Sequence, residues 1–290
     1  MKTNSKFIFP KIKKSKSNPI WNHDHFIVDD KKKRILVYNS TNEGWSEDLT
    51  TLHEENVGSE HPIDITSRKM TLNCIKKFFK ETNNNILEIG SSSGFMIEDL
   101  NKNLPKNFYV GSDIIPINLE KVASNNKNIP FICFDILKCP LPRNSFDIVI
   151  ILNVLEHIKD DELALIKINK LLKKNGKVFI EVPANQELYD NYDSQLMHFR
   201  RYSSKELIMK LNNSGFKIKY KTAVGFFAYP AFYIIKKINR FRNNVNTVEQ
   251  QTRKTKSSFI LKIIFCIERF LSKIISYPFG IRLYIVAEKK

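Results

Sequence analysis

The sequence predicts an α/β protein built on a mostly parallel sheet with helices on both faces. Short apolar runs alternate with segments whose apolar residues recur at helical spacing, from residue 64 to about residue 225. The run FDIVIIL, residues 146–152, is almost wholly apolar, which is typical of a strand buried on both faces. A chain of 290 residues is long enough for one large domain with extensions. We therefore expect one α/β body as the main unit.

The alternation assigns the elements in chain order. The expected helices are amphipathic and cover residues 64–79, 95–104, 118–124, 160–174 and 203–215. The expected strands are short and rich in apolar residues, and they lie at residues 86–88, 108–113, 129–135, 146–152, 177–183, 216–220 and 281–288. Because strands and helices alternate up to the sixth strand, a parallel sheet is favoured over an antiparallel one.

A turn of small residues follows the first of these strands. Residues 86–95 read ILEIGSSSGF, so an apolar run breaks at Gly90 and a helical pattern resumes at Phe95. Small residues let the backbone come close to a ligand, and the helix N-terminus offers unpaired N–H groups. The spacing does not fit G-x-G-x-x-G, and the one Gly-Lys pair precedes Val178, so NAD, FAD and P-loop binding of ATP are not expected. We predict another nucleotide-type ligand.

The turn resembles the first motif of class I S-adenosylmethionine (SAM) methyltransferases, an acidic residue followed by G-x-G-x-G. Here the motif reads Glu88, Gly90, Ser92 and Gly94, with serine in place of the middle glycine. The Leu-Glu-His-Ile segment at 155–158 looks like the small-molecule, quinone-biosynthesis type, with a type 11 methyltransferase domain. The resemblance covers roughly residues 65–225 and the last strand. It implies SAM as cofactor and a Rossmann-like seven-stranded sheet whose last strand inserts antiparallel.

The resemblance also assigns the cofactor site. Asp113, at the end of the second strand, would accept hydrogen bonds from the ribose hydroxyls, and Asp135 would hold the adenine amino group beside Ile136. Asn153 would lie near the methionine end. The full set of predicted cofactor-binding residues is Glu88, Gly90, Ser92, Gly94, Asp113, Asp135, Ile136 and Asn153. Each aspartate taken alone also fits a turn or a helix cap, and the ordered set is what favours a cofactor site.

Histidines and arginines near the fourth and fifth strands are the candidates for chemistry. His157 is the first candidate for the general base, because its free pKa suits proton removal near neutrality; a structural helix-start residue is the alternative. A His-x-Arg-Arg-Tyr segment adds His198 and Tyr202 as further catalytic candidates, and Arg200 and Arg201 as substrate-binding residues. Internal pairing of these arginines is the alternative. No cluster with metal-ligand spacing is visible, so we predict no metal.

Positive charge is concentrated at the two ends of the chain. The net formal charge is +17, yet residues 36–199 hold 17 basic and 23 acidic residues. Residues 1–35 read as a poorly ordered basic arm. The insertion at 226–280 has a basic cluster of Lys236, Lys237, Arg240 and Arg242, and then a helix whose polar side carries Ser258, Lys262, Arg269, Lys273 and Ser276. A helix lying on an anionic membrane surface is expected, with packing on the domain or docking of RNA as alternatives.

These observations define four segments. They are an extension at 1–63, partly disordered, a SAM-binding core at 64–225, the amphipathic helical insertion at 226–280 and a last core strand at 281–290. The four cysteines form no C-x-x-C pair and the N-terminus has no apolar signal region, so a cytoplasmic protein, peripheral at the inner face of the cell membrane, is expected.

The expected activity is SAM-dependent methyl transfer to an oxygen of a small-molecule, glycan or lipid-linked acceptor at the cytosolic membrane face. The segment Asn153-Val154-Leu155-Glu156 replaces the Asn/Asp-Pro-Pro-aromatic motif of enzymes that methylate base amino groups, which argues against methylation of the amino groups of bases. Two alternatives stay open: a catalytically silent SAM-binding adaptor, and an RNA methyltransferase recruited by the basic flanks. The acceptor and the oligomeric state do not follow from one sequence.

Overall fold

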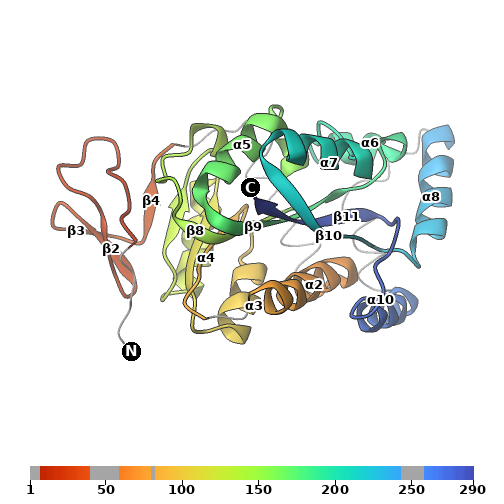
Figure 1. Cartoon of the computed structure of the whole chain (residues 1–290), viewed down its shortest axis with the longest axis horizontal. Helices are drawn as coiled ribbons and strands as arrows, with labels where there is room; N and C mark the ends of the chain where they lie inside the picture. The colour runs from red at the N-terminus through yellow and green to blue at the C-terminus, as the bar shows by residue number, and fades with distance from the viewer. Residues whose placement is uncertain (1–6, 40–58, 80–81, 243–257) are drawn as a thin grey trace.

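An eight-stranded sheet forms the centre of the molecule (Figure 1). The computed structural model describes residues 7–39, 59–79, 82–242 and 258–290. The strand order is β10-β11-β9-β8-β5-β6-β7-β4. The strands, in chain order, are β4 (Ile35–Val37), β5 (Asn85–Ile89), β6 (Phe108–Asp113), β7 (Phe131–Cys133), β8 (Phe146–Leu152), β9 (Leu172–Pro183), β10 (Phe216–Val224) and β11 (Arg282–Lys289).

The strand directions confirm the expected α/β fold. Strands β4, β7, β6, β5, β8 and β9 run parallel to one another, whereas β11 pairs antiparallel with both β9 and β10. All seven expected strands are present, and the last one inserts antiparallel as the resemblance implied. The additional strand, β4, pairs with β7 at the edge of the sheet.

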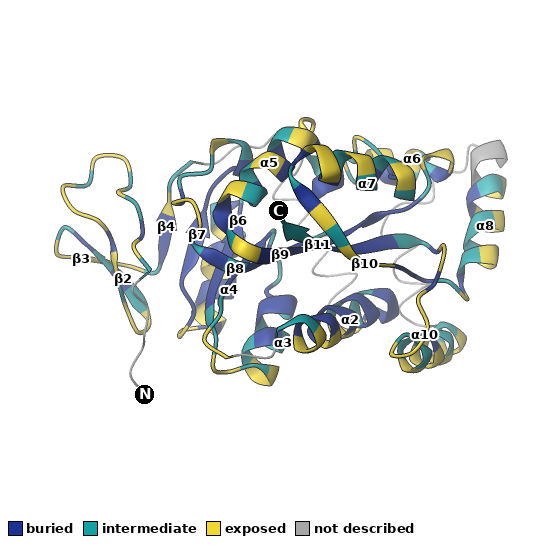
Figure 2. Ribbon diagram, in the orientation of Figure 1, coloured by how far each residue is buried: buried dark blue, intermediate teal, exposed yellow. Residues whose placement is uncertain are grey.

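Helices cover both faces of the sheet, so its central strands are buried (Figure 2). Helices α5 (Asp161–Leu171) and α7 (Ser204–Asn213) pack into one apolar cluster. Helices α2 (Pro62–Phe78), α3 (Phe95–Asn103) and α4 (Pro116–Asn125) pack into the other. The other α-helices of the described residues are short or peripheral: α6 (Asn191–Gln195), α8 (Tyr229–Arg242) and α10 (Phe259–Leu271).

The N-terminal segment differs from the poorly ordered arm expected over residues 1–35. Its described part forms a small sheet of β1 (Ile20–Asn22), β2 (His25–Val28) and β3 (Lys31–Lys33), followed by β4. Phe9 and Phe26 are fully buried, with ring centroids 5.0 Å apart. Aromatic residues dispersed among the lysines therefore anchor the segment. The basic, polar average composition of residues 1–35 does not reveal these few buried rings. Residues 1–6 and 40–58 of the expected extension lie outside the described residues.

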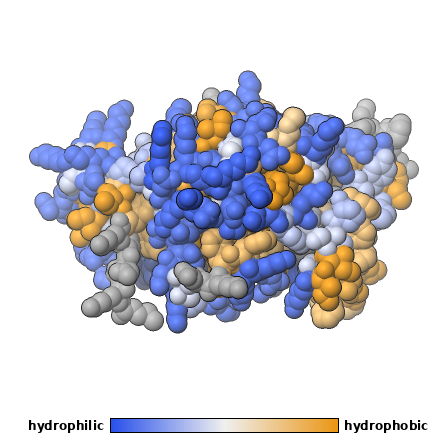
Figure 3. Space-filling view, viewed as in Figure 1, coloured by the Kyte–Doolittle hydropathy of each residue, from blue (hydrophilic) through white to orange (hydrophobic). Residues whose placement is uncertain are grey.

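The insertion before β11 contributes α8 and α10, while residues 243–257 lie outside the described part. Helix α10 packs its Phe265 against the domain, and its buried Glu268 accepts a hydrogen bond of 2.6 Å from the N–H of Gly225. Its other side leaves large apolar residues exposed, and the space-filling view shows an apolar patch over this helix (Figure 3). Within the described residues, every helix is too short or too polar to cross a bilayer.

Candidate functional site

A cavity of about 220 Å³ opens at the carboxyl ends of β5, β6 and β8, next to the end of β7. Parallel strands end at the same edge, so the loops that follow them meet there. The cavity is lined by Asp64, Ile89, Gly90, Ser92, Ser112, Asp113, Ile114, Phe134, Asp135, Ile136, Leu152, Asn153, Val154, His157, Ile158 and Arg282. Six of the eight predicted cofactor-binding residues are in this lining, and Glu88 and Gly94 are not.

The turn after β5 depends on left-handed backbone conformations. Gly90, Ser92 and Gly94 have φ angles of 79°, 39° and 80°. A Cβ atom at Gly90 would lie 2.3 Å from Cγ2 of Val154, so only glycine fits between the turn and the loop after β8. The serine takes a positive φ, and its N–H donates a hydrogen bond of 2.8 Å to Oδ2 of Asp113.

Asp113 holds the turn and also faces the cavity. Its Oδ1 accepts hydrogen bonds from the N–H groups of Ile114 at 2.7 Å and Ile115 at 3.1 Å. Burial raises the pKa of Asp113, and the backbone donors oppose that rise. Asp135 lies at the next loop, where its Oδ1 accepts a hydrogen bond of 2.9 Å from the N–H of Leu137. Both aspartates thus line the cavity after the adjacent strands β6 and β7, in the chain order that the resemblance implies.

Glu88 has a different position from the one its motif suggests. The side chain is buried behind the turn and accepts a hydrogen bond of 3.1 Å from the hydroxyl of Ser91. Burial raises the pKa of Glu88 to about 8. In this structure the residue supports the turn from within and does not line the cavity. Gly94, similarly, begins α3 without reaching the lining.

A charged group that sequence reasoning missed forms the cavity wall near Asn153. Arg282 at the start of β11 pairs with Asp64 at 2.7 Å and with Glu181 at 3.0 Å. Oε1 of Glu181 also accepts a hydrogen bond of 2.9 Å from the Asn153 amide. Glu181 is the feature of the sequence that could have indicated this group, because it is an acidic residue inside the otherwise apolar run VFIEVP and needs a partner when buried.

His157 lies on the cavity wall, and the fold brings His198 next to it. His157 ends a short 3-10 helix, Leu155–His157, and its ring centroid is 4.6 Å from that of His198. Glu156 beside it is 1% exposed, and burial raises the pKa of its carboxyl to about 8. One oxygen or ring nitrogen of each of these three side chains lies within 4.8 Å of the other two. Spacing in the sequence did not reveal this cluster.

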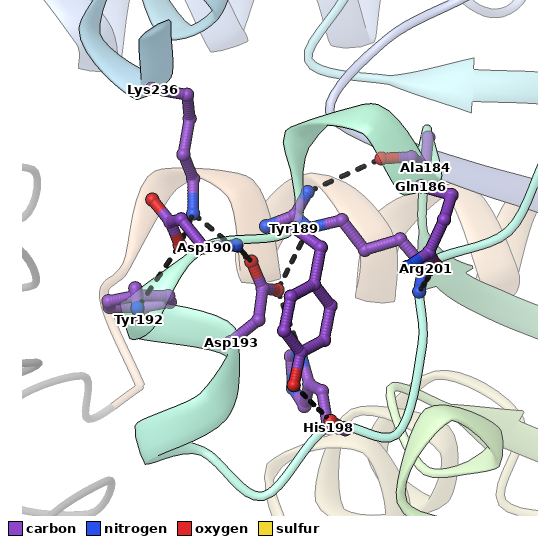
Figure 4. Close-up of polar contacts among 9 residues, drawn as sticks. All are labelled: Ala184, Gln186, Tyr189, Asp190, Tyr192, Asp193, His198, Arg201 and Lys236. Carbon is purple, nitrogen blue, oxygen red and sulfur yellow. Dashed lines mark hydrogen bonds and ion pairs between the residues drawn. The ribbon is translucent and has the colours of Figure 1, made fainter. Parts of the chain in front are cut away.

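His198 belongs to a buried ionic network (Figure 4). Its Nδ1 lies 2.9 Å from Oδ1 of Asp193, and Arg201 pairs with the same oxygen at 2.8 Å. Lys236 of α8 reaches Asp190 at 2.5 Å and Asp193 at 3.3 Å. The basic partners hold the pKa of Asp193 far below its usual range. Lys236 was expected in a surface cluster, but it is buried because it neutralises these two carboxylates.

The other members of the His-x-Arg-Arg-Tyr segment make internal contacts. Arg200 pairs with Asp161 at 2.8 Å, and the fully buried Tyr202 donates its hydroxyl proton to the same carboxylate at 2.8 Å. Arg201 is buried against Asp193. None of the three lines the cavity. Their contacts fit the internal pairing left open from the sequence, and they give no support to catalysis by Tyr202 or to substrate binding by the arginines.

Comparisons with known proteins agree with this fold. A family model described as a methyltransferase domain matches residues 87–180. An uncharacterized protein of Methanocaldococcus jannaschii, MJ0638, is 28% identical over 191 residues, covering 64% of this chain and 80% of that protein.

Two solved structures show the same fold at low sequence identity. A provisionally assigned sarcosine dimethylglycine methyltransferase from Galdieria sulphuraria has a TM-score of 0.57 and 12% identity, covering 84% of this chain and 98% of its own. The N-methyltransferase NodS from Bradyrhizobium japonicum, in complex with S-adenosyl-L-homocysteine, has a TM-score of 0.50 and 13% identity, covering 84% and 99%. The family match over residues 87–180 and the shared fold agree with the resemblance seen in the sequence, which is to class I, SAM-dependent methyltransferases.

Proposed function

We propose that this protein transfers a methyl group from SAM to an oxygen of a small-molecule, glycan or lipid-linked acceptor at the cytosolic face of a membrane. The observation that carries the proposal is the cavity itself, which places Asp113 and Asp135 at the ends of adjacent parallel strands and His157 on its wall. A fold alone does not establish an activity, so the proposal rests on the residues of the site.

The residues of the cavity fit SAM. The carboxylate of Asp113 is an acceptor for the two ribose hydroxyls, and Ile136 offers an apolar surface for adenine beside Asp135. Gly90 permits the close backbone approach that a nucleoside needs. SAM supplies a methyl group on a positively charged sulfur, and the carboxylates of the wall suit that charge.

The two histidines define the acceptor side. Methyl transfer to oxygen needs alignment of the acceptor and removal of its proton. His157 lines the cavity and His198 lies against it, so we propose that this pair promotes removal of the proton from an acceptor hydroxyl. Asp193 orients His198 from behind, and the Glu181–Arg282 pair closes the wall near Asn153.

The membrane part of the proposal is supported by the outer side of α10. Phe259 and Phe270 are 74% and 66% exposed, and Ile274 just after the helix is 83% exposed. Lys262 and Lys273 are exposed beside them. A helix with apolar side chains outward and flanking lysines is suited to the interface of an anionic leaflet. The polar residues Glu268 and Arg269 turn toward the domain, so the outer side of α10 is more apolar than the outer side of an ordinary surface helix.

Sedimentation with vesicles tests the membrane part. The double variant Phe259→Ser, Phe270→Ser removes two exposed apolar side chains of α10 and leaves its buried contacts in place. The matched control, Ile117→Ser with Met209→Ser, removes exposed apolar residues from α4 and α7, where exposed fractions are 53% and 54%. We expect the α10 variant to remain in the supernatant with phosphatidylglycerol vesicles and the control to sediment like the wild type. Equal sedimentation of both variants would refute the assignment.

Transfer is tested by following labelled methyl from SAM into membrane and soluble extracts. Label in the lipid-soluble fraction of membranes, absent with Asp113→Asn, is the expected result. Label in RNA would favour the nucleic-acid alternative, and SAM binding without any transfer would favour the adaptor; either outcome overturns the proposal.

A further inference from the structure

Three side chains of metal-ligand type meet beside the cofactor cavity. One oxygen of Glu156 and one ring nitrogen each of His157 and His198 lie within 4.8 Å of one another. Ligand atoms that share one ion, each about 2.0–2.2 Å from it, lie some 3–4 Å apart, so small side-chain rotations are sufficient to close the site. We propose that Glu156, His157 and His198 bind one divalent transition-metal ion of the Zn²⁺ kind.

Glu156 provides a second, independent observation that points to a cation at this cluster. The residue is 1% exposed, and within the part of the chain that the structure describes its Oε2 makes no hydrogen bond. An unpaired carboxyl oxygen in the interior is destabilising, and most such atoms have a partner. A cation at the centre of the cluster would supply that partner.

A carboxylate holds the ring of His198 on the side away from the cluster, as is usual for histidines that bind a metal. Its Nδ1 lies 2.9 Å from the carboxylate of Asp193, which is itself fixed by Arg201 and Lys236 (Figure 4). An ionised carboxylate can only accept, so the Nδ1 proton is donated to Asp193 and the lone pair of Nε2 is left for the ion. The same contact fixes the orientation of the ring.

The chain brings the two ligand-bearing segments together through its backbone. The N–H of Phe199, next to His198, donates a hydrogen bond of 2.9 Å to the carbonyl of Glu156. The rings of His157 and His198 meet edge to face at an interplanar angle of 74°. Two imidazoles with one carboxylate favour Zn²⁺ or a similar ion over Mg²⁺ or Ca²⁺, which prefer oxygen ligands.

Three protein ligands leave positions open toward the cavity that His157 lines. An acceptor hydroxyl bound there would have a lowered pKa and would release its proton to solvent. Its oxygen would then form a bond to the methyl carbon as the carbon–sulfur bond breaks, and the sulfur would leave with the bonding pair as a neutral thioether. This role rests on the proposed methyl transfer, whereas the binding of the ion does not.

The test uses untagged, metal-free protein titrated with Co²⁺, whose visible absorption reports its ligands, and with Zn²⁺ by calorimetry. We expect one ion per chain. His198→Ala and Glu156→Gln should abolish this binding, and Asp193→Asn should weaken it by about 10–100-fold. His23→Ala, which removes an exposed histidine from the turn between β1 and β2, should bind like the wild type. Circular dichroism confirms that each variant is folded.

A second measurement needs no variant. X-ray absorption of the Zn²⁺-loaded wild type should show two imidazole ligands, and one or none would overturn the site. The site would also be overturned if the folded wild type bound no stoichiometric metal ion. It would be overturned as well if both His198→Ala and Glu156→Gln bound the ion as tightly as the wild type does. Calorimetry with SAM on the metal-free protein separates the two proposals: SAM binding and methyl transfer without metal binding leave the proposed function standing and remove the metal site. Metal binding without SAM binding would leave the metal site standing and would refute the proposed function.

Discussion

Replacing Gly90 with alanine should destabilise the protein strongly, because two independent penalties meet at this residue. The φ angle of 79° is left-handed, which costs a residue with a Cβ about 1–2 kcal/mol. The new methyl group would also lie 2.3 Å from Val154, and overpacking of this kind costs about 1–3 kcal/mol. The two terms sum to a loss of about 2–5 kcal/mol in the free energy of unfolding.

Urea denaturation of four proteins separates the two penalties: the wild type, Gly90→Ala, Val154→Ala and the double variant. The double variant should recover the steric part and retain the conformational part, so the cycle should give a favourable coupling between the two sites. SAM affinity should fall with Gly90→Ala as well, since the turn borders the cavity. A loss below about 0.5 kcal/mol for Gly90→Ala, within the range of an ordinary surface substitution, would refute this geometry of the turn.

Three further substitutions test the surrounding structure. Asp113→Asn should weaken SAM binding at least tenfold, or about 1.4 kcal/mol, in calorimetry, because the charge facing the ribose is lost; unchanged affinity would exclude that role. Glu268→Ala should lower the free energy of unfolding by about 1–3 kcal/mol, because the N–H of Gly225 loses its buried acceptor, and an unchanged urea midpoint would contradict the anchoring of α10. Burial raises the pKa of Glu88 to about 8 from 4.5, so the folded chain retains a proton that the unfolded chain has released. Wild-type stability should therefore fall as pH rises from 4.5 to about 8, and Glu88→Gln should fall less; parallel pH profiles would contradict it.

The parts of the site that the sequence predicted are those fixed by local pattern and strand order. Asp113, Asp135 and His157 each follow a recognisable apolar run, and the carboxyl ends of parallel strands must meet at one edge. Once the strands were recognised, their ends defined the cavity without any tertiary information. The antiparallel last strand came from the resemblance, because periodicity alone gives only alternation.

The parts that were missed depend on contacts between distant segments. Arg282 reaches the cavity only because β11 inserts beside β9, and nothing local to its own strand indicates a partner at Asp64. His198 and Lys236 likewise meet across Asp193, which lies in the short helix α6. A surface cation and a buried one look the same in a sequence until their counter-charge is placed, so the internal pairing of Lys236 was not foreseeable.

Isothermal titration calorimetry of the purified wild-type protein with SAM tests the central claim most directly, with NAD and ATP as comparison ligands. The structure predicts saturable binding of one SAM per chain, competition by S-adenosyl-L-homocysteine, and no binding of NAD or ATP at this site. A folded protein that gives no saturable heat with SAM, or that binds NAD in its place, would contradict the assignment of the cavity.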